Sequence, residues 1–208
     1  FFEHSVHKQS VLYYAQSLWG MVRQRQDARY QYYKAVNNAK REMYDLHTDL
    51  LGNYQQHNIK TILTATEVLA HNGFSITIQS AISSLAHVKA ATGLRGRWDW
   101  LQEQPAIICD VAHNPAGLRE VLTQFAMLKA AKKHIVVGFV KDKDVDEALA
   151  LFPADATYYF CNAQIQRALP AAELKEKATA AGLTGNDYAT IIEAAHAAQD
   201  AMIPADAL

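Results

Sequence analysis

Two side chains that can do chemistry stand close together near the middle of the chain, Asp110 and His113. They follow the apolar run Ile107–Cys109 and precede an amphipathic run from Gly117 to Lys129, an order that predicts a buried strand, a tight turn and a helix. Ligands of open α/β sheets bind outside the carboxyl ends of the strands, where such turns lie. A carboxylate there can hold ribose hydroxyls or a metal-bound water, and an imidazole at a helix entrance can contact a phosphate. The plainer alternative is that Asp110 only caps the helix and that His113 is an ordinary turn residue.

Charged residues also follow the next two expected strands. Lys143 and Asp144 come after the second strand, and an ammonium beside a carboxylate suits a charged, zwitterionic or phosphate-bearing ligand. Arg167 comes after the third strand, just before Pro170, which is a good first residue for a helix. The alternatives are a solvated loop for the first pair and a surface arginine for Arg167.

Two further polar residues lie nearer the N-terminus. Arg97 stands in a short segment, residues 93–97, that separates two patterns in the sequence, and it could reach a ligand held between two modules. Asn58 falls in the first turn of an expected helix, where its amide could contact the edge of a purine. Each has a simpler interpretation, as a solvated linker arginine and as part of a polar first turn.

The elements that must position these residues alternate regularly after residue 94. Strands are expected over 106–110, 134–139 and 156–161, and helices over 115–130, 145–152, 171–181 and 191–202, with no strand after the last helix. This alternation predicts an α/β fold with a mostly parallel sheet and right-handed crossovers. Cys109 and Cys161 both fall in expected strands, which favours buried thiols in a reducing compartment over a disulfide.

The first 93 residues follow a different pattern. A strand is expected over 11–15, a hairpin turn over 36–39 and a return strand over 43–51, whereas residues 23–41 show no clean period. Helices are expected from residue 55 to Asn72-Gly73 and over 77–90. The sequence therefore predicts two modules, residues 1–93 and 94–208.

Composition limits the kinds of partner. The 208 residues carry a net charge of −1 and half are hydrophobic, which gives no case for nucleic acid or an anionic membrane. No apolar run has transmembrane length and no signal peptide precedes the first module, so a cytoplasmic protein is expected. The sequence contains neither a Gly-x-x-x-x-Gly-Lys-Ser/Thr loop nor a zinc-type Cys and His spacing. It begins without Met and shows no strand after its last helix, and we therefore expect a fragment.

Five short motifs occur in order along the chain. They are Leu51-Gly52-x-Tyr54-Gln55-x-x-Asn58, Gly96-Arg97-Trp98, Asp110-x-Ala112-His113-Asn114-Pro115, Asp142-Lys143-Asp144 and Arg167-Ala168-x-Pro170. In this order they resemble the folylpolyglutamate synthase/dihydrofolate synthase family of the Mur ligase superfamily.

The resemblance implies a fold and an activity. Residues 94–208 would form the Rossmann-like C-terminal glutamate-ligase domain of Mur ligases, without its last strand, and residues 1–93 the end of the central ATPase domain. The family phosphorylates a substrate carboxylate with ATP, and the amine of L-glutamate then attacks the acyl phosphate. ATP and Mg²⁺ would be the cofactors, with the phosphate loop and metal ligands outside this chain, which is expected to be inactive by itself. Folate or dihydropteroate and L-glutamate would be the small-molecule substrates, and the full-length enzyme is expected to be a monomer.

The resemblance also implies roles for single residues. His113 and Asp110 would be catalytic, with Asp110 on the ribose and His113 near the transferred phosphate. Asn58 and Arg97 would contact the adenine and the phosphates. The residues expected on the amino-acid side are Lys143, Asp144 and Arg167. Two alternatives stay open, a Mur-type ligase for peptidoglycan precursors and a non-catalytic binding module with the same fold.

Overall fold

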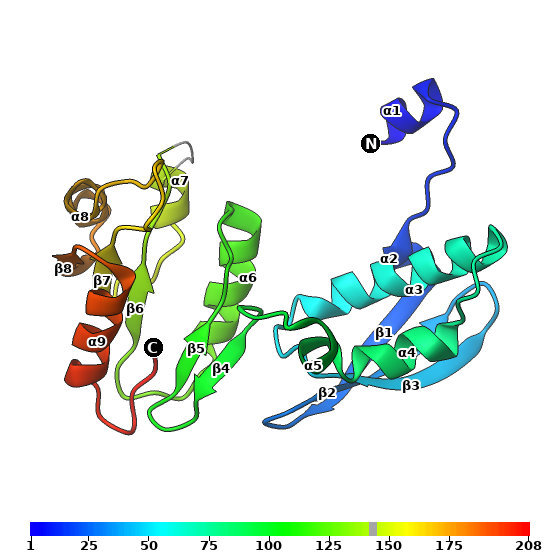
Figure 1. Cartoon of the computed structure of the whole chain (residues 1–208), viewed down its shortest axis with the longest axis horizontal. Coiled ribbons are helices and arrows are strands. Elements are labelled where there is room, and N and C mark those ends of the chain that lie inside the picture. Colours follow the sequence, from blue (N-terminus) through cyan, green and yellow to red (C-terminus); the bar gives the residue numbers. More distant parts are fainter. Residues whose placement is uncertain (142–144) are drawn as a thin grey trace. The chain divides into compact units, whose positions relative to one another are not determined.

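The computed structural model describes residues 1–141 and 145–208, which divide into two compact units (Figure 1). The first unit is Phe1–Arg95 and the second is Gly96–Leu208. The division falls inside the segment 93–97 in which the sequence pattern changes. Each unit is described by itself below.

The first unit is a three-stranded antiparallel sheet with helices packed on it. In chain order its elements are α1 (Phe2–His7), α2 (Ala15–Leu18), β1 (Trp19–Gln26), β2 (Gln31–Asn37), β3 (Glu42–Thr48), α3 (Gln55–His71), α4 (Ile78–Leu85) and α5 (Val88–Thr92). Alternate residues of β2 are buried, as expected for a strand with one covered face. Trp19, Tyr33 and Leu63 are at the centre of the core between sheet and helices.

Two expectations for this unit need correction, and one stretch without a prediction forms strands. Residues 11–14 are not a strand, because this apolar run has no partner strand, and Val11, Tyr13 and Tyr14 are exposed. The aperiodic stretch 23–41 contains the end of β1 and all of β2, which pairing with β3 stabilises. The helix expected over 77–90 is two helices that break at Ala86 and His87.

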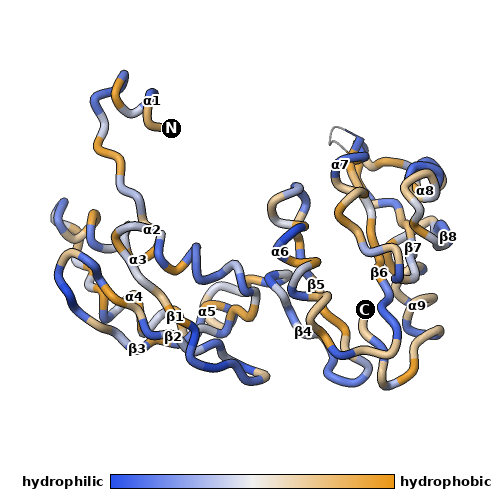
Figure 2. Tube along the Cα trace, turned by 180° about the vertical axis from the view of Figure 1, so that it is seen from behind, coloured by the Kyte–Doolittle hydropathy of each residue, from blue (hydrophilic) through white to orange (hydrophobic). Residues whose placement is uncertain are grey.

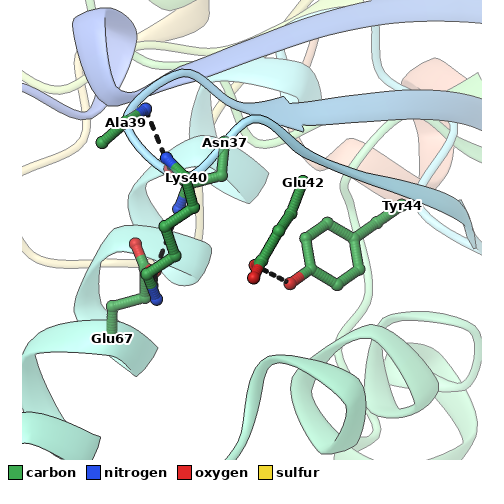
Figure 3. Close-up of polar contacts among 6 residues, drawn as sticks. All are labelled: Asn37, Ala39, Lys40, Glu42, Tyr44 and Glu67. Carbon is green, nitrogen blue, oxygen red and sulfur yellow. Dashed lines mark hydrogen bonds and ion pairs between the residues drawn. The ribbon is translucent and has the colours of Figure 1, made fainter.

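The β2–β3 hairpin is fastened to α3 by a small polar cluster (Figure 3). Glu67 on α3 accepts hydrogen bonds from Asn37 Nδ2 at 2.9 Å and from Lys40 Nζ at 2.7 Å. The Asn37 side chain also accepts a bond from the Ala39 backbone N–H at 3.1 Å and so shapes the turn. Beside it, the Tyr44 hydroxyl donates to Glu42 at 2.6 Å, and this bond raises the pKa of Tyr44 to about 12.

The second unit alternates strands and helices, as the sequence predicts. An antiparallel pair, β4 (Asp99–Gln102) and β5 (Ile107–Cys109), lies in the same unit as the parallel sheet β6 (His134–Val137), β7 (Thr157–Cys161) and β8 (Thr184–Tyr188). The helices of this unit are α6 (Pro115–Ala126), α7 (Val145–Leu149), α8 (Ala171–Ala180) and α9 (Ile191–Ala201). In Figure 2 the hydrophobic colour runs along much of β5 and β6, whereas the β4–β5 turn is hydrophilic.

Successive residues of β6 face two different cores. Ile135 and Val137 pack on the side of α6 and α7, where Phe160 and Leu174 are buried. Val136 packs on the opposite side, against the core that contains Ala194 and Ala198 of α9. The central strands are thus covered on both faces, as is typical of parallel sheets.

In the second unit the structure adds two strands that the sequence did not predict, β4 and β8. Strand β8 has the polar sequence Thr-Gly-Asn-Asp-Tyr and forms the edge of the sheet, so it shows no apolar run. Gly185 is required there, because a Cβ at this position would lie 2.0 Å from the carbonyl oxygen of Tyr158. The four helices predicted for this unit are confirmed as α6, α7, α8 and α9, and β6 and β7 are parallel as predicted.

The prediction for the cysteines was half right. Neither cysteine is in a disulfide, and Cys161 is buried at the carboxyl end of β7, which raises the pKa of its thiol to about 11. The prediction of a buried Cys109 was wrong, because this thiol is exposed beside a cavity between β5 and β6. Within the described part of the chain, no helix is both long enough and apolar enough to cross a lipid bilayer.

Candidate functional site

The turn after β5 is built around the carboxylate of Asp110. Its Oδ1 accepts a hydrogen bond from the Ala112 backbone N–H at 2.9 Å, and its Oδ2 accepts one from the Trp98 backbone N–H at 2.7 Å. The Val111 N–H donates to the Gly96 carbonyl at 3.0 Å. Asp110 therefore joins the turn that follows β5 to the segment that precedes β4. It does not cap the following helix, since Asn114 takes that position.

The segment that Asp110 holds has an unusual backbone. Trp98 has a φ of +51° although it is not glycine, and its indole is buried. Gly96 has a φ of +68°, and a Cβ there would lie 2.6 Å from Cγ1 of Val111. Only glycine fits this close approach. Gly96-Arg97-Trp98 was recognised as a motif in the sequence. The hydrogen bond from Trp98 to Asp110 could not be predicted from residue spacing, because it joins residues that are twelve positions apart.

His113 is exposed at the entrance to α6. Its Nδ1 lies 3.1 Å from the carbonyl oxygen of Val111, and because a carbonyl only accepts, Nδ1 is the donor in this bond. This leaves Nε2 as the nitrogen available to a ligand. Asn114 accepts a bond from the Gly117 N–H at 2.8 Å and so caps the helix, and Pro115 occupies the first turn. The turn is thus well fixed, with one imidazole presented to solvent.

The loops after β6 and β7 are joined to each other through their backbones. The Lys141 N–H donates to the Arg167 carbonyl at 3.0 Å, and the Leu169 N–H donates to the Phe139 carbonyl at 2.9 Å. Both Lys141 and Arg167 have exposed side chains. Since β5, β6 and β7 run parallel, these two cations and His113 follow the carboxyl ends of strands at one edge. Lys143 and Asp144, which the sequence also placed here, lie outside the described residues.

Arg97 belongs to the second unit and Asn58 to the first. The guanidinium of Arg97 is half-buried and donates to the Gly96 carbonyl at 3.3 Å. Asn58 lies in the first turn of α3, where its Nδ2 donates to Gln55 Oε1 at 2.9 Å. The side chain of Asn58 is exposed, while that of Gln55 is buried.

Sequence reasoning missed the residue that supports the loop before Asn58. Gln31 of β2 is fully buried, and its Nε2 donates to the carbonyls of Leu50 and Gly52, both at 3.0 Å. Its Oε1 accepts a bond from the Tyr33 hydroxyl at 2.6 Å, and burial raises the pKa of Tyr33 to about 12. A single glutamine within a strand does not show in the sequence that its side chain is buried or which backbone groups it binds.

The donor set at the edge of the second unit suits anions. An imidazole, an ammonium and a guanidinium can pair with phosphate or carboxylate oxygens, and a carboxylate such as that of Asp110 can accept from ribose hydroxyls. Among residues 1–141 and 145–208, no group of three or more His, Cys, Asp or Glu side chains could hold a metal ion. These residues fit a nucleotide or an amino acid and do not fit a metal site, so no step is assigned to a metal here.

Comparison with known proteins identifies this unit. Residues 96–207 match the family described as Mur ligase, glutamate ligase domain. The chain belongs to the Mur ligase family. Its curated relatives are named folylpolyglutamate synthase or dihydrofolate synthase/folylpolyglutamate synthase. It is 31% identical over 101 residues to folylpolyglutamate synthase of Lacticaseibacillus casei, a match that covers 48% of this chain and 23% of that relative.

Solved structures share the fold of this Mur ligase chain. Folylpolyglutamate synthase of Mycobacterium tuberculosis, complexed with ADP, superimposes with a TM-score of 0.77 and 21% identity, over 96% of this chain and 44% of that one. A bifunctional folylpolyglutamate synthase/dihydrofolate synthase with Mn, AMPPNP and L-glutamate bound gives a TM-score of 0.73 and 19% identity, over 99% and 46% of the two chains. The chain thus spans less than half the length of these Mur ligase structures. The mixed α/β fold of the second unit is that of the Mur ligase C-terminal domain.

Proposed function

We propose that this chain is part of an ATP-dependent ligase that adds L-glutamate to folate, to dihydropteroate, or to both. The proposal rests on one observation above all. In a domain of the glutamate-ligase family, the turn after β5 fixes Asp110 by two backbone bonds and presents the imidazole of His113 at the ligand edge. The relatives named folylpolyglutamate synthase support this choice of substrate class.

In the proposed reaction a substrate carboxylate attacks the γ-phosphorus of ATP, which gives an acyl phosphate and ADP. The amine of glutamate then attacks the acyl carbon, phosphate leaves, and the nitrogen loses a proton. Phosphoryl transfer depends mainly on positioning and charge stabilisation. The exposed cations at the sheet edge are therefore the groups that can stabilise the negative charge of the transferred phosphate. Holding the two reactants together can contribute about 7–11 kcal/mol to the lowering of the barrier.

Each candidate residue has a role in this proposal. Asp110 accepts from the ribose hydroxyls, and His113 stabilises the transferred phosphate through Nε2. Asn58 and Arg97 contact the adenine and the phosphates. Arg167, together with Lys143 and Asp144, binds the incoming amino acid. Residues 1–93 would be the end of the central ATP-binding domain and residues 94–208 the glutamate-ligase domain.

The decisive experiment uses the enzyme that contains this chain and compares two exposed histidines of the second unit. His113→Ala should lower glutamate-dependent ADP release by at least about a hundredfold, the low end of the usual contribution of a positioned acid–base or electrostatic group. His196→Ala on α9 should leave it unchanged, because His196 lies on a helix far along the chain from the proposed machinery.

Three outcomes would count against the proposal. Full activity of His113→Ala would remove the assigned role of the imidazole. Turnover with a peptidoglycan precursor but not with folate or dihydropteroate would make the protein a cell-wall ligase. ATP-dependent ligation by the 208-residue chain alone would contradict the expectation that it is inactive by itself.

A further inference from the structure

The side-chain amide of Gln31 makes hydrogen bonds in all four directions that an amide offers. Its Nε2 donates to the carbonyls of Leu50 and Gly52, both at 3.0 Å. Its Oε1 accepts from the Tyr33 hydroxyl at 2.6 Å and from Arg23 Nη1 at 3.3 Å. Because a carbonyl only accepts, the two bonds of Nε2 fix which way the amide is turned.

The turn that this amide binds, residues 50–54, leads directly into α3. The Gly52 carbonyl accepts a second bond, from the Gln55 N–H at 3.0 Å, and Gln55 is the first residue of the helix. Arg23 Nη1 also donates to Asn53 Oδ1 in the same turn. The start of α3 is therefore tied to β1 and β2 through side chains.

The first turn of α3 extends this anchoring to Asn58. Asn58 lies three residues after Gln55, and residues at this spacing share one face of a helix. The side chain of Gln55 is buried, and its Oε1 accepts a bond from Asn58 Nδ2 at 2.9 Å. The exposed amide of Asn58 is thus held by a path of hydrogen bonds that begins at Gln31.

Gln31 occupies a position at which an apolar residue is expected. It is one of the alternate buried residues of β2, and the next two, Tyr33 and Ala35, belong to the hydrophobic core of the unit. Burying an amide costs free energy that its hydrogen bonds largely offset, so a fully paired amide adds little to stability. Such a network does fix one arrangement of the groups that it joins. This favours positioning of the turn over simple packing as the role of Gln31.

We propose that Gln31 is a positioning residue for the base of a bound adenine nucleotide. It acts through the turn 50–54 and Gln55, and it holds the Asn58 amide where this amide can pair with the edge of the adenine. The inference rests on the contact between Asn58 and adenine in the proposed function. Gln31 itself does not touch the nucleotide, since its side chain is fully buried and its hydrogen bonds go to protein groups.

A double-mutant cycle on the enzyme that contains this chain tests the path. Gln31→Met keeps the length of the side chain and removes its hydrogen bonds, and it should weaken ADP binding in calorimetry at least about fivefold, the loss of about one well-placed hydrogen bond. In an enzyme that already carries Asn58→Ala, the same change should weaken ADP binding by less than about twofold, because the group that Gln31 positions is gone. The affinity for inorganic pyrophosphate, which has no base, should not change.

Two controls separate positioning from a loss of stability. Gln26 lies directly opposite Gln31 on β1, and its exposed side chain accepts a bond from the same Arg23 Nη1 at 3.3 Å. Gln26→Met should leave the ADP affinity unchanged. Ile82→Ala on α4 removes buried volume from the core of the same unit and should lower the unfolding free energy without changing the ADP affinity. Should Gln31→Met fail to fold, Gln55→Met interrupts the same path at its last bond and should give the same loss and the same lack of additivity.

Three results would overturn the proposal. Unchanged ADP affinity in the folded Gln31→Met enzyme is the most direct. Equal losses from Gln31→Met with and without Asn58→Ala would show that Gln31 does not act through Asn58. A matching loss of affinity in Ile82→Ala would make the effect one of stability alone.

Failure of the ligase proposal gives a different pattern. An enzyme that binds ADP and shows the expected cycle, yet ligates glutamate to neither folate nor dihydropteroate, would support the role of Gln31 and reject the proposed substrates. Normal ligation of folate together with an unchanged ADP affinity in Gln31→Met would do the reverse.

Discussion

The Oδ2 atom of Asp206 lies 3.5 Å from Nε2 of His134, and both side chains are buried. Asp206 also accepts backbone bonds from Ile203 at 2.9 Å and from Lys132 at 3.0 Å. On its other side, His134 Nδ1 lies 3.0 Å from the Tyr159 hydroxyl of β7. This chain of contacts fastens the last residues to the start of β6 and to the centre of the parallel sheet.

The Asp206 carboxylate should make the second unit sensitive to acid. The Ile203 N–H is the main cause of its lowered pKa, with smaller contributions from the Lys132 N–H and from His134. A carboxyl whose native pKa lies below its unfolded value, about 3.9, contributes stability above that value and loses it as the pH falls through the native pKa. Urea unfolding between about pH 3 and pH 6 should therefore show a steeper acid loss for the wild type than for Asp206→Asn. Identical pH slopes would contradict this assignment.

Two leucines of α3 should differ sharply in their contribution to the first unit. Leu63 is 0% exposed and lies in the core under the sheet, whereas Leu69 of the same helix is 39% exposed. Leu63→Ala should cost about 2–5 kcal/mol of unfolding free energy, because it leaves a cavity. Leu69→Ala should cost less than about 1 kcal/mol. Chemical denaturation followed by the fluorescence of the buried Trp19 measures both, and equal losses would mean that α3 does not pack as described.

Two glycines of the second unit should respond to alanine in opposite directions. Gly185→Ala places a Cβ against the backbone of β7 and should cost about 1–3 kcal/mol or more through overpacking. A Cβ at Gly117 in the first turn of α6 would meet only ordinary contacts, the nearest at 3.4 Å. Gly117→Ala should therefore stabilise the unit by about 0.5–1 kcal/mol through helix propensity. Thermal unfolding of the two variants provides the measurement, and a stable Gly185→Ala variant would refute the placement of β8 beside β7.

Asp110 should contribute to stability as well as to the proposed chemistry. Asp110→Ala removes the acceptor of two backbone N–H groups, those of Trp98 and Ala112, and should cost about 1–3 kcal/mol. Glu120→Ala, an exposed change on the following helix, is the control and should stay within about 0.5 kcal/mol of the wild type. If Asp110→Ala leaves the unfolding free energy unaltered, the carboxylate does not stabilise the link between the turn after β5 and the segment before β4.

The sequence by itself determined the elements whose signals are local. The 3.6-residue period and the Asn72-Gly73 stop predict α3, and the run Asn114-Pro115 predicts the start of α6. Apolar runs followed by charged turns predict β5, β6 and β7 with their ligand edge. The position of Asp110 and His113 at the end of β5 follows from the same pattern, because a strand, a turn and a helix are contiguous in the chain.

The tertiary structure decided the features that depend on distant partners. Strand β8 is polar and forms only because β7 offers it a parallel edge, while residues 11–14 are apolar and stay irregular without such an edge. Three further features depend in the same way on residues far along the chain. They are the exposure of Cys109, the hydrogen bond from the Trp98 N–H to Asp110, and the hydrogen bond from the buried Gln31 side chain to the Leu50 carbonyl. Burial and backbone pairing between distant segments are properties of the packed chain, and no local period in the sequence records them.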